Sequence, residues 1–182
     1  MAAALPRARE EARRIRCRNN LNQLAKGMAT YLNEYGDNRF YPCPLGRGAV
    51  TTGYNGAEWF AALYWTGTVP DPGVFICPSS GDTNHDGADI GFTRTTAAFG
   101  SQTVSYAGMH WRSITPTGSA IRDDFPPNEV MASDDTEGTV NHGEAGMCVM
   151  FFDSHVEWRT ADEIDPLTAV GQKGGLLEKL RN

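Results

Sequence analysis

Residues 2–35 read AAALPRAREEARRIRCRNNLNQLAKGMATYLNEY, with Gly27 as the only glycine and Pro6 as the only proline. Apolar side chains recur at every third or fourth position, which is the period of one face of an α-helix. The pattern predicts one long amphipathic helix that stops at Gly36. Such a helix is about 45 to 50 Å long, longer than the domain that the rest of the chain can form. Part of it must therefore protrude or pack on a neighbouring molecule.

The composition is that of one ordinary globular domain. The chain has 182 residues, of which 40% are hydrophobic, and a formal net charge of −6. Residues 1–20 hold six arginines and two glutamates, whereas the rest holds ten basic and twenty acidic residues. An acidic body argues against a nucleic-acid surface, which needs clustered cations. The basic stretch either touches phosphates or anionic lipid headgroups or is a solvated helix face with ion pairs.

Downstream of the helix, shorter elements alternate with loops. Asn55 and Glu58 bracket the start of an aromatic segment, which predicts a capped helix of about ten residues. Extended segments are expected at 74–77, 103–109 and 129–133, and a hairpin at 146–152 and 155–159 with a two-residue loop. Its register would place Phe151 opposite Val156 and Val149 opposite Trp158. We therefore expect an α+β fold, with a spine helix at 1–35 and a globular part at 36–182.

Several segments resemble a known family in the right order. Residues 4–24, ALPRAREEARRIRCRNNLNQL, resemble the part of the N-terminal helix that follows the membrane-embedded half in prepilin-like proteins related to type II secretion pseudopilins. Further landmarks resemble the large subgroup with a C-terminal His to Asp-Gly-His motif: Phe75 to Ser79, Ser105 to Gly108, Ala132 to Asp134, Asn141-His142, and Phe151 to Trp158.

The resemblance implies a pilin-like fold and a structural, non-enzymatic role. Subunits of this family pack through their N-terminal helices into a type IV pilus-like filament or a secretion pseudopilus in the cell envelope or outside the cell. The implied partners are like subunits and the envelope secretion or pilus assembly machinery, with no nucleic acid. The assembly helix would use Leu5, Ala8, Ala12, Ile15, Leu21, Leu24 and Met28. Within it, residues 2–16 would contact other subunits, and Leu21, Leu24 and Met28 would be buried on the sheet.

Two departures from the family pattern stand out. The apolar first half of the helix and its cleavage site do not precede Ala4. We therefore expect the chain to be the part outside the membrane, attached only through a missing upstream segment. The Asp-Gly turn of the family reads Asp153-Ser154, and serine is less suited than glycine to a turn that needs positive φ.

One loop has the ligand pattern of a calcium site. Asp82, Asn84 and Asp86 alternate before Gly87, as in the first half of a calcium loop, and Asp89 would help to complete the oxygen shell. The distal glutamate of an EF-hand is missing, since position 93 is Thr. The alternative is a plain polar turn in which Asp and Asn bond their own backbone.

His142, Asp153 and His155, with Asp134 and Asp135, invite a transition-metal or hydrolase interpretation. We expect them to be structural instead, with Asp153 bonding turn amides and the histidines bonding backbone at strand ends. The four cysteines form no Cys-x-x-Cys pair, so no zinc knuckle is indicated. In an exported protein, Cys43 and Cys77 are candidates for a disulfide.

A rival interpretation is a soluble, calcium-stabilised binding module with a pilin-like fold. It would present the loops at 44–56 and 111–128 to a polymer or protein ligand, with exposed Trp65 and Trp111 as aromatic platforms. An enzyme ranks third, since it would need a cleft around His142 and His155.

Overall fold

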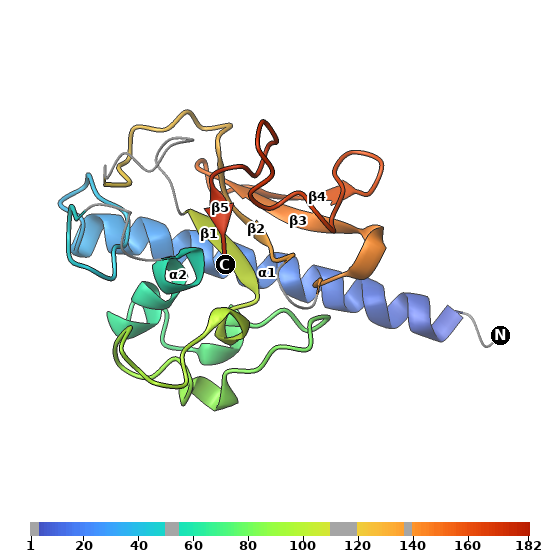
Figure 1. Cartoon of the computed structure of the whole chain (residues 1–182), viewed down its shortest axis with the longest axis horizontal. Coiled ribbons are helices and arrows are strands. Elements are labelled where there is room, and N and C mark those ends of the chain that lie inside the picture. The colour runs from blue at the N-terminus through green and yellow to red at the C-terminus, as the bar shows by residue number, and fades with distance from the viewer. Residues whose placement is uncertain (1–3, 50–54, 110–119, 137–139) are drawn as a thin grey trace.

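A long helix packs on a five-stranded antiparallel sheet in the computed structural model, which describes residues 4–49, 55–109, 120–136 and 140–182 (Figure 1). The two α-helices are α1 (Ala4–Glu34) and α2 (Gly56–Trp65). The strands are β1 (Tyr106–Met109), β2 (Val130–Asp134), β3 (Gly146–Phe151), β4 (Val156–Thr160) and β5 (Leu180–Arg181), in the spatial order β4-β3-β2-β1-β5. Short 3-10 turns lie at Pro72–Phe75, His85–Gly87, Ser101–Thr103 and Gly143–Ala145. The expected α+β arrangement is confirmed.

Helix α1 has a buried half and an exposed half. Its C-terminal part contacts β3, β4, α2 and the Pro72–Phe75 turn, and Leu21, Leu24 and Met28 are almost completely buried there. The N-terminal part extends past the body (Figure 1), and Leu5 and Ile15 on it are 63% and 56% exposed. The predicted helix end is confirmed, because α1 stops two residues before Gly36. No helix of the described residues is long and apolar enough to cross a membrane.

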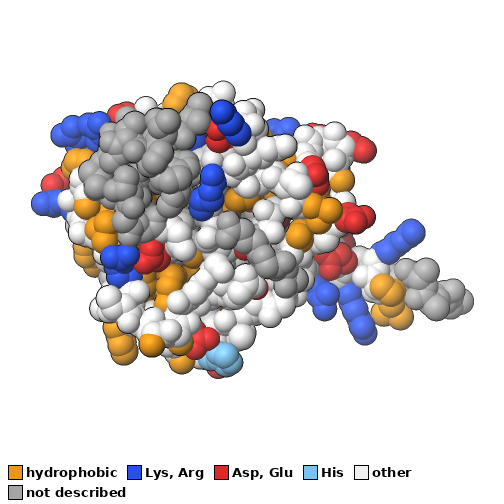
Figure 2. Space-filling model, viewed as in Figure 1, with side chains coloured by type: hydrophobic (Ala, Val, Ile, Leu, Met, Phe, Trp, Pro, Cys, Tyr) orange, Lys and Arg blue, Asp and Glu red, His pale blue; other side chains and the backbone are white. Residues whose placement is uncertain are grey.

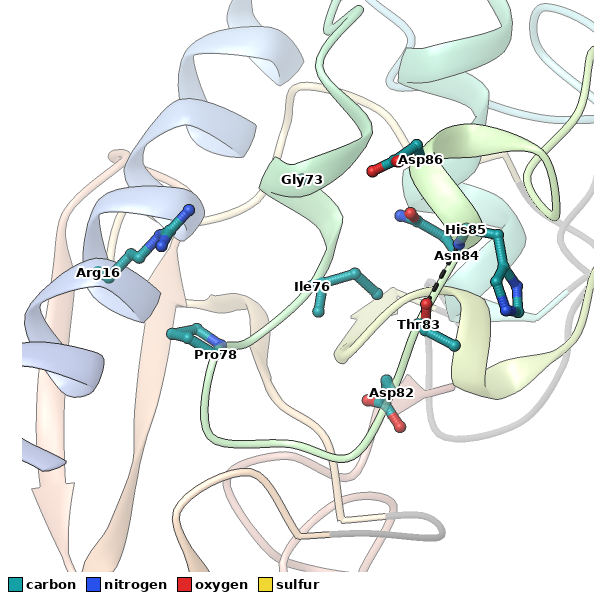
Figure 3. Close-up of a pocket in the computed structure, with 9 residues that line it drawn as sticks. All are labelled: Arg16, Gly73, Ile76, Pro78, Asp82, Thr83, Asn84, His85 and Asp86. Atoms are coloured by element: carbon teal, nitrogen blue, oxygen red, sulfur yellow. Dashed lines mark hydrogen bonds between the residues drawn. The ribbon is translucent and has the colours of Figure 1, made fainter. Parts of the chain in front are cut away.

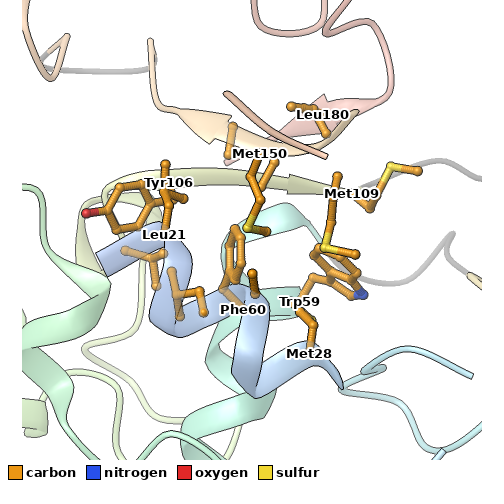
Figure 4. Close-up of a cluster of buried hydrophobic side chains, with 14 of the residues drawn as sticks. Leu21, Met28, Trp59, Phe60, Tyr106, Met109, Met150 and Leu180 are labelled. Carbon is orange, nitrogen blue, oxygen red and sulfur yellow. The ribbon is translucent and has the colours of Figure 1, made fainter. Parts of the chain in front are cut away.

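Helix α2 begins with the predicted capping box. The Asn55 side chain accepts from the Glu58 backbone N–H, and the Glu58 carboxylate accepts from the Asn55 N–H, each at 2.9 Å. These two bonds satisfy backbone donors that a helix start leaves without partners. The cap aims Trp59 and Phe60 into the core beside Tyr106 of β1 (Figure 4).

The β3–β4 hairpin differs from the predicted register by one residue. Met150 lies opposite Val156, and Cys148 lies opposite Trp158. Phe151 N–H donates to His155 O, so three residues rather than two form the loop. The third of them, Ser154, has φ +72°, as the left-handed residue of a three-residue hairpin loop does. The extra loop residue brings Trp158 to the face of Cys148 instead of the face of Val149.

The expected strand at 74–77 is wrong, because this segment starts in a 3-10 turn. Asp71 caps the turn by accepting from Gly73 N–H, and Pro72 supplies the φ that a turn start needs. Ile76 has extended backbone angles as the turn ends. The turn therefore delivers Cys77 beside α1 rather than to the sheet.

The C-terminal segment adds a strand that the sequence pattern did not predict. Glu163 accepts from the Thr160 backbone N–H and hydroxyl, and a series of turns follows. Pro166 disfavours helical geometry at Asp165, the residue before it. The chain then returns as β5, whose Leu180 lies opposite Met109 of β1.

Candidate functional site

The exposed half of α1 carries the first four residues of the proposed assembly surface. Leu5, Ala8, Ala12 and Ile15 are all exposed, and basic side chains surround them (Figure 2). Ion pairs of Glu10 with Arg13 and of Glu11 with Arg14 run along this half. Surface ion pairs of this kind contribute little to stability. Leu21, Leu24 and Met28 belong instead to the core of this chain.

His142 lies in the loop before β3, where its side chain joins three other chemically active side chains in a buried cluster instead of bonding backbone at a strand end as we expected. Cys17 comes from α1, Cys77 from the segment after the Pro72–Phe75 turn, Asp134 from the end of β2, and His142 from the loop before β3. One potential ligand atom from each lies within 4.8 Å of the others. All four residues are buried. The cluster therefore joins four segments that are far apart in the sequence.

Short contacts connect the members of this Cys17–Cys77–Asp134–His142 cluster. The Cys17 thiol donates to Asp134 Oδ1 at 2.9 Å, and Cys77 Sγ lies 3.6 Å from His142 Nε2. His142 Nε2 is also 3.6 Å from Asp134 Oδ2. The Nε2 edge of the imidazole thus faces both the sulfur and the carboxylate.

A second layer of contacts holds the cluster in place. His142 Nδ1 lies 2.8 Å from Glu10 Oε1, and the same carboxylate accepts from Ser79 Oγ. Asp134 accepts from the Cys148 backbone N–H at 2.6 Å and from Asn141 Nδ2 at 3.0 Å. The contact with Glu10 fixes the imidazole by one nitrogen and leaves Nε2 directed into the cluster.

Trp158 covers the cluster on the sheet side. Its ring packs edge-on against His142 at 5.3 Å, and the Arg14 guanidinium lies 4.2 Å from the indole centre. The His142 side chain is consequently fully shielded from solvent.

The cluster perturbs the acid–base properties of its members. Burial lowers the pKa of His142, but Cys77, Asp134 and Glu10 favour the imidazolium more strongly and raise that pKa to about 9. A hydrogen bond from Cys17 favours the Cys77 thiolate, and with His142 it outweighs burial and lowers the pKa of Cys77 to about 7. Burial raises the pKa of Cys17 well above its usual range. Opposite shifts on neighbouring groups are common at functional sites.

The Cys43–Cys77 disulfide is not formed, because both side chains remain thiols. Cys77 Sγ points into the cluster beside Cys17, whereas the Cys43 backbone is hydrogen-bonded to the Tyr31 side chain. Cys17 and Tyr31 are 14 positions apart on α1, which separates them by about 21 Å along the helix. The two cysteines therefore pack near different parts of the same helix, too far apart to be bridged.

The calcium-loop residues line one wall of an open pocket of about 450 Å³ that Arg16, Ile76 and Pro78 complete (Figure 3). Asp82 accepts from Ser105 Oγ, Asn84 caps Gly87, and Asp89 contacts His85. The carboxylates of Asp82, Asp86 and Asp89, all in the described part of the chain, do not gather at one point. Calcium in this loop stays a prediction.

Asp153 and His155 occupy the β3–β4 loop. Asp153 Oδ1 accepts from the His155 backbone N–H at 3.1 Å and contacts the His155 imidazole as well. Of the aromatic platforms that a binding module would use, Trp65 is half-buried, packs against Phe99 with tilted ring planes and donates from Nε1 to Ile90 O. Trp111 lies outside the described residues, as do parts of both loops of that interpretation.

Comparison with known proteins adds one finding. Residues 6–64 match the sequence model of a family described as "Protein of unknown function (DUF1559)". No curated protein and no solved structure matches the chain.

Sequence reasoning grouped Asp134 with His142 as possible metal ligands but missed Cys17 and Cys77, because the four members have no ligand spacing. Cys17 and His142 are 125 positions apart, and metal motifs that can be read from a sequence place ligands a few residues apart. A weaker signal existed, since each of the four residues lies within one of the segments on which the pilin-like resemblance rests.

Proposed function

We propose that this protein is a structural subunit of a type IV pilus-like or secretion pseudopilus-like filament of the cell envelope, assembled through the exposed half of α1. The observation that carries the proposal is the division of this single helix. From Cys17 onward one face of the helix is part of the core, whereas Leu5 is 63% exposed on the segment that projects from the body (Figure 1). Ile15 is 56% exposed on the part of the helix that Glu10 and Arg14 hold against the body.

The energetics of an exposed helix support this role. A projecting helix gains none of the tertiary packing that stabilises most helices in proteins. Burial of its apolar positions against like helices would supply that packing, and the alternating arginines and glutamates would offer ion pairs to neighbouring subunits. The resemblance of residues 4–24 to the corresponding segment of prepilin-like proteins points to the same surface.

We propose no catalytic role. Cys77 and His142 are the best candidates for a nucleophile and its base, but both are completely buried. A substrate would have no access to either atom without opening the core.

The test places a charge on the exposed helix. In the cell that makes the protein, Leu5→Glu is expected to remove the chain from the sheared filament fraction, because the carboxylate would be buried between subunits without a partner. The matched control is Leu176→Glu, which makes the same change at a 52% exposed leucine of the body. The purified variants are expected to keep the melting temperature of the parent protein. Normal assembly of Leu5→Glu, or equal loss with Leu176→Glu, would exclude the proposed surface.

A further inference from the structure

We propose that Cys17, Cys77, Asp134 and His142 bind one zinc ion, which fastens helix α1 to the sheet and to the segment that follows the Pro72–Phe75 turn. The proposal rests on the donor set, on the spacing of its atoms and on the groups that surround it. It is independent of the filament role, since a binding module of this fold would contain the same cluster.

The donor set is that of a closed structural zinc site. Two thiolates, one imidazole and one carboxylate are all ligands that zinc accepts, and four protein ligands complete its preferred tetrahedron. Calcium and magnesium require oxygen ligands and would leave both sulfurs unused. Binding would release to solvent the protons held by the two thiols and by His142 Nε2, leaving Zn²⁺ with three anionic ligands and a neutral His142 whose Nδ1–H faces Glu10.

The distances suit a tetrahedron. With Zn–S bonds of about 2.3 Å and Zn–N and Zn–O bonds of about 2.0 to 2.2 Å, sulfur and nitrogen ligands are about 3.5 Å apart, and nitrogen and oxygen about 3.4 Å. Cys77 Sγ and His142 Nε2 are 3.6 Å apart, as are His142 Nε2 and Asp134 Oδ2. These two distances thus already match a tetrahedral site, and all four ligand atoms lie within 4.8 Å of one another. Cys17 Sγ and Asp134 Oδ1, 2.9 Å apart in the thiol hydrogen bond, would separate when the thiol proton leaves.

The surroundings of His142 are those of a metal-binding imidazole. Histidine ligands commonly contact a carboxylate through the nitrogen that does not bind the metal, which fixes the ring and its tautomer. Glu10 occupies this position on Nδ1 at 2.8 Å and is itself held by Ser79. The Cys148 N–H and Asn141 hold the Asp134 carboxylate in the same way.

A disulfide between Cys17 and Cys77 is the competing explanation for two neighbouring thiols. It accounts for the sulfurs but assigns no role to the Asp134 carboxylate and the His142 imidazole that converge on them, beyond the contact of these two groups with each other. A zinc ion would use all four side chains as ligands.

The first experiment uses the wild-type chain. Protein purified under reducing conditions and incubated with Zn²⁺ is expected to retain one zinc per chain after gel filtration, measured by elemental analysis. Replacement by Co²⁺ is expected to give the intense visible absorption and the sulfur-to-metal charge-transfer band of a tetrahedral thiolate site. Removal of zinc by a chelator is expected to lower the melting temperature, which added zinc then restores.

Single substitutions identify the ligands. Cys77→Ser and His142→Ala are expected to lose stoichiometric zinc and the cobalt spectrum. Cys43→Ser is the control, because Cys43 lies beside Tyr31, about 21 Å along α1 from Cys17. This variant is expected to keep the metal. Because a ligand variant can lose metal merely by unfolding, each is compared with wild-type protein by circular dichroism.

Three results would overturn the proposal. The first is a folded, reduced wild-type protein that binds no zinc or cobalt. The second is a Cys17–Cys77 disulfide found by peptide mapping of protein purified without reductant from its own cell. The third is retention of stoichiometric zinc by folded Cys77→Ser and His142→Ala variants, which would place bound metal elsewhere.

Discussion

Glu10 Oε1 lies 2.8 Å from His142 Nδ1, across 132 positions of sequence. The contact sits where α1 leaves the body, because Glu10 is half-buried while its neighbours Arg9 and Glu11 are exposed. Ser79 binds the same carboxylate, so one side chain joins the helix, the segment after Cys77 and the loop before β3. The exposed half of α1 is therefore anchored at its base by a polar contact rather than by apolar packing.

Glu10→Gln is expected to weaken zinc binding by about 10- to 100-fold, because the amide cannot support the imidazole as a carboxylate does. Competition with a chelator of known affinity measures the change. The control is Glu11→Gln, which alters the adjacent and more exposed glutamate and should leave the affinity unchanged. Equal affinities for Glu10→Gln and wild-type protein would remove Glu10 from the support of His142.

Leu24→Ala is expected to lower the free energy of unfolding of the isolated chain much more than Leu5→Ala. Leu24 is fully buried, and its truncation should lower the free energy of unfolding by about 2 to 5 kcal/mol. Leu5 is 63% exposed, and its truncation should change that free energy by about 0.5 kcal/mol or less. Urea denaturation compares the two. Similar losses for both would contradict the division of α1 into a core half and a free half.

Gly56→Ala is expected to destabilise the fold severely. A Cβ atom at this position would lie 1.8 Å from the Arg181 carbonyl oxygen and 2.5 Å from that of Gly108, both of them backbone atoms. The start of α2 would have to move away from β1 and β5, with a loss of about 3 kcal/mol or more. Gly100→Ala is the control, since a Cβ there meets nothing within 4 Å. Thermal denaturation compares the two variants. Equal melting temperatures would contradict the close contact of Gly56 with β1 and β5.

Ser154→Gly is expected to stabilise the protein by about 0.5 to 1 kcal/mol. Ser154 has φ +72°, a conformation that strains residues with a side chain and that glycine adopts freely. Ser154→Ala should bring no such gain, because alanine keeps the Cβ atom that causes the strain. A stabilisation by alanine equal to that by glycine would assign the effect to the lost hydroxyl instead of the turn.

Local signals predicted the helices well and the sheet only in part. The period of residues 2–35 and the Asn55–Glu58 cap depend on contacts within one or two helical turns, and the structure shows both. The β3–β4 register depends on one additional loop residue, Ser154, whose positive φ does not follow from its residue type. The segment at 74–77 has apolar side chains that suit a strand, yet the Asp71–Pro72 pair forms a turn.

By itself, the sequence determined the long helix, its end before Gly36, the capped second helix and the positions of β2 to β4, because these follow from interactions between near neighbours. Only the tertiary structure decided where α1 leaves the body, that β5 adds an edge strand beside β1, and which side chains surround each cysteine. Cys17, Cys77, Asp134 and His142 meet because four distant segments fold around one helix, and the sequence encodes such a meeting only through the whole fold.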